Sequence, residues 1–241
     1  MQLTLQEKQM YSVMRAVYAS GIPISFKGSM VLKACLLEAG YAEDTRHTVD
    51  IDANWNTDTL PSPDQMIKSL QEAIGEGGID LNVSIFRMYG EGRSAGFEFT
   101  DKNTGEALFS MDIDVNRPIA STKVYEVEEF HFCGVVPIQI LSDKISVVSS
   151  DKVFRRIKDV IDLYYLSKVF SFHKDDVLQS LEKSGKVLGT FHAFLYEHEE
   201  LEHSYRKFRF SGDVDKPSFN DVYHSVRSYI KDLFPNNEIS I

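Results

Sequence analysis

Two aspartates separated by one apolar residue, Asp50-Ile51-Asp52, constrain the fold of this chain more than any other feature. In an extended strand, residues two apart project from the same face, so both carboxylates would lie on one side of a sheet. A Gly28-Ser29 turn precedes them and opens an apolar helical pattern that ends at Gly40. Backbone N–H groups at such a turn can hold phosphate oxygens. The combination indicates a site for a hard divalent cation and a nucleoside triphosphate.

A second acidic pair with the same spacing lies at Asp112 and Asp114. Phe109, Met111 and Ile113 alternate with these acids, so a strand here would also carry two carboxylates on one face. Carboxylates packed together raise one another's pKa, and a bound cation offsets this repulsion. We predict Asp50 and Asp52 as Mg²⁺ ligands and Asp112 and Asp114 as further ligands. The alternative is that some of these acids face solvent on a half-exposed sheet.

The periodicity of apolar residues predicts an α+β fold, with a mixed sheet flanked by helices and a helical C-terminal region. Ser and Thr caps at Thr4 and Ser62 mark two helix starts. We expect strands at residues 48–53, 81–89, 96–100 and 107–115, with a hairpin turn at 102–105, and later helices at 174–184, 189–203 and 219–234. The change from strands to helices places the expected boundary near Leu141, which divides the chain into residues 1–141 and 142–241.

Composition and charge narrow the function classes. Of 241 residues, 43% are hydrophobic, yet the apolar runs are far shorter than a membrane span, so we expect a cytoplasmic protein without membrane contact. The net charge of −10 argues against broad nonspecific binding to DNA. The charge is uneven, with 11 Lys and Arg against 20 Asp and Glu in residues 1–141 and 15 against 16 in the rest. The acidic excess therefore accompanies the candidate metal site.

The helical half contains its own group of charged residues. Asp159 and Asp162 lie three positions apart, on neighbouring positions of one helix, and Lys144 lies 15 positions before Asp159. Taken alone, such a pattern also fits an ordinary surface helix with a charged face. A second lysine, Lys152, lies between Lys144 and Asp159 and is the other candidate for any role assigned to a lysine of this segment.

Four motifs in this order resemble the AbiEii/AbiGii family of nucleotidyltransferase-like toxins, members of the DNA polymerase β-type nucleotidyltransferase superfamily. The resemblance covers about residues 20–170, and the motifs that carry it are Lys27-Gly28-Ser29, Arg46-x-Thr48-x-Asp50-Ile51-Asp52, Asp143-Lys144 and Arg156-x-Lys158-Asp159-x-x-Asp162-Leu163. It implies a nucleotidyltransferase-type mixed sheet and transfer of a nucleoside monophosphate from a triphosphate with Mg²⁺.

The resemblance also implies roles for individual residues. The catalytic set would be Asp50, Asp52, Lys144 and Asp159, with Lys144 neutralising phosphate charge and Asp162 as a possible addition. The nucleotide would be bound by Lys27, Gly28, Ser29, Arg46 and Thr48. The implied partners are a nucleoside triphosphate, a cognate antitoxin and an acceptor, either RNA such as tRNA or a protein. The implied setting is a bacterial toxin–antitoxin or abortive-infection system.

Two alternatives from other classes remain open at this point. One is a small-molecule nucleotidyltransferase of the antibiotic-modifying type, because an acidic surface suits a cationic acceptor. The other is a non-catalytic module that binds a nucleotide or a partner, which splayed carboxylates would favour.

Overall fold

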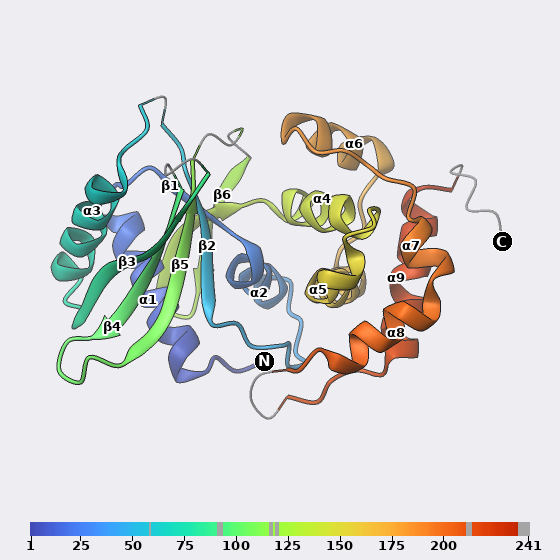
Figure 1. Cartoon of the computed structure of the whole chain (residues 1–241), viewed down its shortest axis with the longest axis horizontal. Coiled ribbons are helices and arrows are strands. Elements are labelled where there is room, and N and C mark those ends of the chain that lie inside the picture. The colour runs from blue at the N-terminus through green and yellow to red at the C-terminus, as the bar shows by residue number, and fades with distance from the viewer. Residues whose placement is uncertain (58, 91–93, 116–117, 119–120, 211–213, 236–241) are drawn as a thin grey trace. The chain divides into compact units, whose positions relative to one another are not determined.

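A computed structural model describes residues 1–57, 59–90, 94–115, 118, 121–210 and 214–235. The chain divides into two compact units (Figure 1). Unit 1 comprises residues 1–43 and 47–136, and unit 2 comprises residues 44–46 and 137–241. The expected boundary at Leu141 falls inside a helix that begins at Pro137. Val135 and Val136 lead directly into this helix, and Pro137, a residue typical of the first helical position, marks its start.

Unit 1 contains a mixed sheet. Among the described residues, the sheet has seven strands in the order β3-β4-β5-β2-β1-β7-β6. The pairs β2–β5 and β1–β7 are parallel, and the other neighbours are antiparallel. The strands are β1 Ile24–Lys27, β2 Asp50–Trp55, β3 Leu81–Tyr89, β4 Ser94–Asp101, β5 Ala107–Asp114, β6 Thr122–Val127 and β7 Phe130–Val135. The expected α+β class with a mixed sheet is confirmed.

The helices of unit 1 begin where the sequence signals place them. They are α1 Leu5–Ala19, α2 Gly28–Glu38 and α3 Pro63–Glu76. Thr4 and Ser62 each form a capping box with the residue three positions on, which satisfies N–H groups of the first turn. Helices α1 and α3 pack on each other and on the sheet, while α2 packs against β1, β2 and β6 (Figure 1).

Strands β6 and β7 are not among the expected strands. Exposed charged residues such as Lys123 and Glu126 interrupt the apolar pattern of β6. Glu128 lies in the tight turn between the two strands and has a φ of 50°. Gly and Asn are the residues that usually adopt this conformation, so a glutamate does not predict a turn here. On the buried face of these strands, the rings of Tyr125 and Phe132 stack on each other. The ring of Tyr11 in α1 stacks on Phe130 and Phe132.

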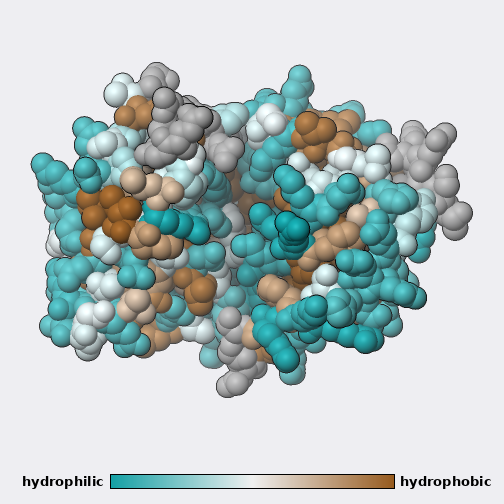
Figure 2. All heavy atoms as spheres, in the orientation of Figure 1, coloured by the Kyte–Doolittle hydropathy of each residue, from teal (hydrophilic) through white to brown (hydrophobic). Residues whose placement is uncertain are grey.

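Unit 2 is helical in the residues that the structure describes. Its elements are α4 Pro137–Val148, a 3₁₀ turn Val153–Arg155, α5 Ile157–Val169, α6 Lys174–Lys183, α7 His192–Tyr196, α8 His198–Lys207 and α9 Phe219–Leu233. Helix α5 packs against both α4 and α9. No helix among the described residues combines the length and apolar character needed to cross a bilayer. On the face shown in Figure 2, hydrophobic residues form separate patches in a largely hydrophilic surface, as is usual when the core is buried.

Candidate functional site

Strands β2 and β5 place four aspartates on one face of the sheet. Ile51 and Ile113 point to the opposite face and are fully buried, so the alternation in both strands places their acids on the polar face. The two strands are parallel neighbours, and Asp52 lies directly opposite Asp112 in the register. Each strand carries its two carboxylates on one face, as the alternation predicts, and the two strands lie side by side in the sheet.

The turn that opens α2 lies against one of these acids. Gly28 has a φ of +70°, and a Cβ added there would lie 2.3 Å from Oδ2 of Asp52. Only glycine fits, because any side chain would be strained and would collide with the carboxylate. Lys27 precedes the helix and makes no side-chain cap to its N–H groups. The N-terminus of α2, with its positive end of the helix dipole, therefore lies next to Asp52.

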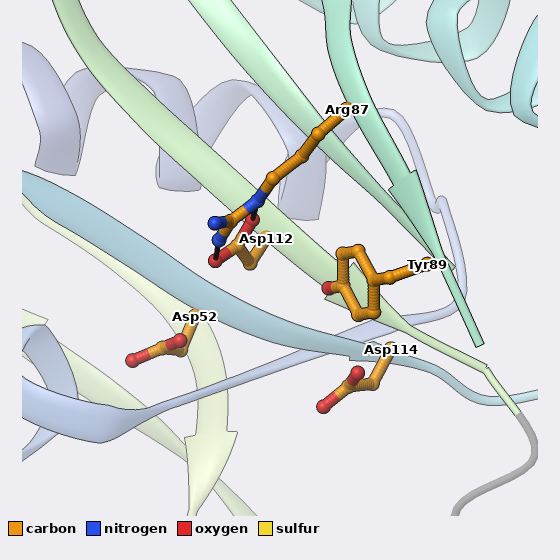
Figure 3. Close-up of a pocket in the computed structure, with 5 residues that line it drawn as sticks. All are labelled: Asp52, Arg87, Tyr89, Asp112 and Asp114. Atoms are coloured by element: carbon orange, nitrogen blue, oxygen red, sulfur yellow. Dashed lines mark hydrogen bonds and ion pairs between the residues drawn. The ribbon is translucent and has the colours of Figure 1, made fainter.

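Cationic side chains pair with the two acids of β5. Nζ of Lys27 lies 2.7 Å from Oδ2 of Asp114 and 2.5 Å from Oδ1 of Asn54. The guanidinium of Arg87 forms a two-point ion pair with Asp112, in which Nε lies 3.2 Å from Oδ1 and Nη2 bonds Oδ2 (Figure 3).

Arg87 and Tyr89 are site residues that the sequence analysis missed. Along β3, Val83 and Ile85 lie opposite the buried Phe99 and Phe97, so plain alternation would also direct Arg87 into the core. An irregularity between Ile85 and Arg87 inserts one residue and turns Arg87 to the polar face. The sequence signal for this insertion is an arginine at a position where strand alternation predicts an apolar residue.

Five side chains line an open pocket of about 330 Å³: Asp52, Arg87, Tyr89, Asp112 and Asp114 (Figure 3). Burial and the nearby charges of Asp114 and Asp112 raise the pKa of the Tyr89 phenol, which therefore stays protonated at neutral pH. Asp50 lies outside this lining, and its Oδ1 accepts a 2.6 Å hydrogen bond from the buried hydroxyl of Thr48.

The donor set fits a hard cation in its chemistry, because Mg²⁺ prefers carboxylate oxygens. The side chains do not converge as a complete set: the described residues contain no group of three His, Cys, Asp or Glu placed to hold a metal ion. Two of the four carboxylates already have cationic partners, since Arg87 binds Asp112 and Lys27 binds Asp114. The backbone register alone brings Asp52 and Asp112 to adjacent positions.

Four other predicted residues gather within unit 2. Nζ of Lys144 lies 2.6 Å from Oδ1 of Asp159 and 2.8 Å from Oδ2 of Asp162. Arg46 binds both oxygens of Asp162, at 2.8 and 2.9 Å, and Nε of Arg156 lies 2.7 Å from Oδ2 of Asp159. Both carboxylates are at most 1% exposed, so the surface-helix interpretation of this segment is wrong.

Nearby charges favour the ionised forms of Lys144 and Asp162. Burial alone would lower the pKa of Lys144, but the charges of Asp159 and Asp162 outweigh it and raise the pKa. Burial would likewise raise the pKa of Asp162, but Arg46 and Lys144 lower it well below its usual range. The Lys144 side chain is 8% exposed and its ammonium already binds two carboxylates, whereas the Arg156 side chain is 47% exposed.

Gly28 offers a test of the turn. Gly28→Ala is expected to abolish nucleotide binding and to lower the free energy of unfolding by about 1–2 kcal/mol through left-handed strain. The matched control is Gly40→Ala, since Gly40 has a similar φ of +78° and no atom within 4 Å of an added Cβ. Urea unfolding of both variants measures the cost of backbone strain, and nucleotide titration measures the additional effect of the contact between residue 28 and Asp52. Equal nucleotide binding by the two variants would contradict the role of the turn.

Comparisons with known proteins identify the family and the fold of the chain. The profile of the family described as "Nucleotidyl transferase AbiEii toxin, Type IV TA system" matches residues 13–225, which span both units. Among solved structures, the chain is similar to MenT4, a nucleotidyltransferase toxin from Mycobacterium tuberculosis H37Rv, with a TM-score of 0.64 and 13% identity over 97% of this chain and 84% of that chain. At this identity the likeness shows the fold. Comparison with curated proteins finds no match.

Proposed function

Because the chain belongs to the AbiEii family of nucleotidyltransferase toxins of type IV toxin–antitoxin systems, we propose that it transfers a nucleoside monophosphate from a triphosphate to an acceptor hydroxyl, with release of pyrophosphate. The observation that carries this proposal is the position of Asp52, directly opposite Asp112 in the sheet and in contact with the Gly28 turn of α2. Carboxylates and a helix N-terminus at one place suit a cation and the phosphates that it accompanies.

The residues of the polar face have separate proposed roles. Asp52 and Asp112 would hold Mg²⁺, with Asp50 and Asp114 as flanking ligands. When bound, Mg²⁺ would supply charge neutralisation for the triphosphate and the leaving pyrophosphate. The N–H groups of Gly28 and Ser29 would bind phosphate oxygens, and Lys27 would add a positive charge beside them. Thr48 would orient Asp50 through the hydrogen bond described above rather than contact the nucleotide.

The ion-pair network of unit 2 supports a different role for Lys144 than direct phosphate binding. Its ammonium is buried between two carboxylates, so we assign Lys144, Asp159 and Asp162 to positioning Arg46 and Arg156. Arg156 is the exposed member of the network and keeps guanidinium donors for an anionic ligand. The direct catalytic role that the resemblance implies for Lys144 and Asp159 is the alternative to this assignment.

The proposed acceptor is the one that the resemblance of the sequence motifs implies. We propose RNA, with tRNA as the first candidate and a protein as the second, and a cognate antitoxin as the regulatory partner. One observation favours a second function, a binding module without catalysis: the described residues hold no convergent group of three acids. A nucleotidyltransferase is expected to bind a cation and a triphosphate together, whereas a module that binds a partner is not.

Melting curves distinguish them. Mg²⁺ and a nucleoside triphosphate together are expected to stabilise the protein by about 2.7 kcal/mol at a hundredfold excess over Kd, a shift of several degrees in Tm. Either one alone should shift Tm much less, since the metal would bridge carboxylates and phosphates. The variant Asp52→Asn should lose the joint effect. An unchanged melting curve with all four triphosphates would instead support the binding module.

A further inference from the structure

The pairing of the strands positions Arg87 to form its ion pair with Asp112. The strand irregularity turns Arg87 to the polar face, and Gly96 of β4 lies between the two residues in the register. A Cβ at Gly96 would lie 2.8 Å from both Cγ of Arg87 and Oδ1 of Asp112. Because Gly96 has no side chain, Arg87 of the edge strand β3 can reach across β4 to Asp112 of β5.

This ion pair conflicts with the metal-binding role proposed for Asp112. The fork of Arg87 engages both oxygens of the carboxylate, through Nε and Nη2. It occupies lone pairs that a metal would need, and its positive charge repels a divalent cation at the same place. A guanidinium and a divalent cation therefore compete for Asp112.

Arg87 has an alternative to this pairing within the pocket. Its side chain is 53% exposed, so moving it costs little packing. The guanidinium lies over two aromatic rings, 5.0 Å from the centroid of Phe86 and 5.6 Å from that of Tyr89. These rings can support the guanidinium after it leaves the carboxylate. Two of its five N–H donors are engaged with Asp112, and a planar fork also matches a phosphate group.

We propose that Arg87 exchanges partners when substrate binds: it pairs with Asp112 in the metal-free protein and moves to a phosphate oxygen of the triphosphate once a divalent cation occupies Asp112. This inference rests on the proposed function of the pocket and adds to it a residue that couples metal binding to nucleotide binding. Charge favours the exchange, because three carboxylates and one cationic side chain, Arg87, line the pocket, and Lys27 pairs with one of these carboxylates, Asp114. The cation replaces Arg87 at the carboxylate, and the triphosphate brings Arg87 a new anion.

Metal binding without nucleotide provides the first test, with Mn²⁺ as the probe and free Mn²⁺ measured by electron paramagnetic resonance. Arg87→Met is expected to tighten Mn²⁺ binding about three- to fivefold, because the cation no longer has to break a partly exposed ion pair. The matched control is Lys8→Met, which removes another partly exposed cation whose Nζ lies 2.8 Å from Glu128. Lys8→Met should leave Mn²⁺ binding unchanged.

Nucleotide binding provides the second test, with α,β-methylene analogues of the four triphosphates at saturating Mn²⁺. Arg87→Met should bind the tightest analogue about tenfold more weakly, as expected for loss of a charge-assisted hydrogen bond. Arg87→Lys keeps the charge without the fork and should recover part of this affinity. The opposite signs of the two effects distinguish partner exchange from a merely structural ion pair, for which both affinities would stay equal or fall together.

The outcomes of these tests distinguish a failure of the partner exchange from a failure of the proposed nucleotidyltransferase function. If wild type binds Mn²⁺, Asp52→Asn abolishes that binding and Arg87→Met leaves it unchanged or weaker, the exchange is wrong while the metal site stands. If Arg87→Met tightens Mn²⁺ but binds the analogue as wild type does, Arg87 does not move to the phosphates and the proposal also fails. If wild type binds neither Mn²⁺ nor analogue, the proposed function falls together with it.

Discussion

Replacing Asp52 with asparagine is expected to lower the rate of nucleotide transfer by on the order of 100-fold or more, the usual cost of removing a group that stabilises charge in the transition state. Asp52 is the acid that contacts the Gly28 turn and lies opposite Asp112, so its loss would affect the metal and the triphosphate together. Asparagine keeps the shape of the side chain and removes the charge. The assay follows α-labelled nucleotide transferred into cellular RNA or protein.

The same variant should remain folded. Asp52 is half-buried on the polar face, and such positions change the free energy of unfolding by about 0.5 kcal/mol or less when no core contact is lost. Glu106→Gln is the matched control, because Glu106 is an exposed acid in the turn between β4 and β5. Wild-type transfer by Asp52→Asn at equal abundance would show that this carboxylate does not hold the metal.

Replacing Lys144 with methionine is expected to destabilise unit 2 by about 3–5 kcal/mol, the cost of leaving buried carboxylates without their partner. Asp159 and Asp162 are both at most 1% exposed, and each loses a short contact to the ammonium. Urea unfolding measures the loss. The control Lys152→Met removes an exposed lysine and should change stability by no more than about 0.5 kcal/mol.

A second substitution tests whether charge is the cause. Adding Asp159→Asn to Lys144→Met leaves the two-point pair of Arg46 and Asp162 in place, and frees only Arg156, which is 47% exposed. The double variant should therefore recover part of the lost stability. If Lys144→Met unfolds like wild type and loses only turnover, Lys144 acts on the nucleotide directly and the positioning role is wrong.

The positions of the acidic residues of the pocket could be predicted from the sequence. The period-two pattern around Ile51 and Ile113 predicted which residues face the core, and the structure confirms it. The resemblance carried by four ordered motifs predicted the family, which the profile match over residues 13–225 confirms. These features are local, because strand alternation and helix caps depend on neighbours in the chain.

The cationic half of the pocket could not be predicted in the same way. Arg87 reaches the site through one inserted residue in β3 and through the missing side chain of Gly96, and both depend on how distant strands pair. The pairing of Asp162 has a similar origin, since Arg46, which binds both of its oxygens, comes from a three-residue segment that joins unit 2 from within the sequence of unit 1. Charged residues on a predicted helix give no sign that opposite charges from elsewhere will cover them.

The most direct measurement of the central claim is anomalous diffraction from crystals of the protein with Mn²⁺ and a non-hydrolysable triphosphate. The account predicts a manganese peak bonded to carboxylate oxygens of Asp52 and Asp112, with phosphate oxygens of the analogue on the N–H groups of Gly28 and Ser29. A peak at other residues, or a triphosphate bound away from the Gly28 turn, would contradict it.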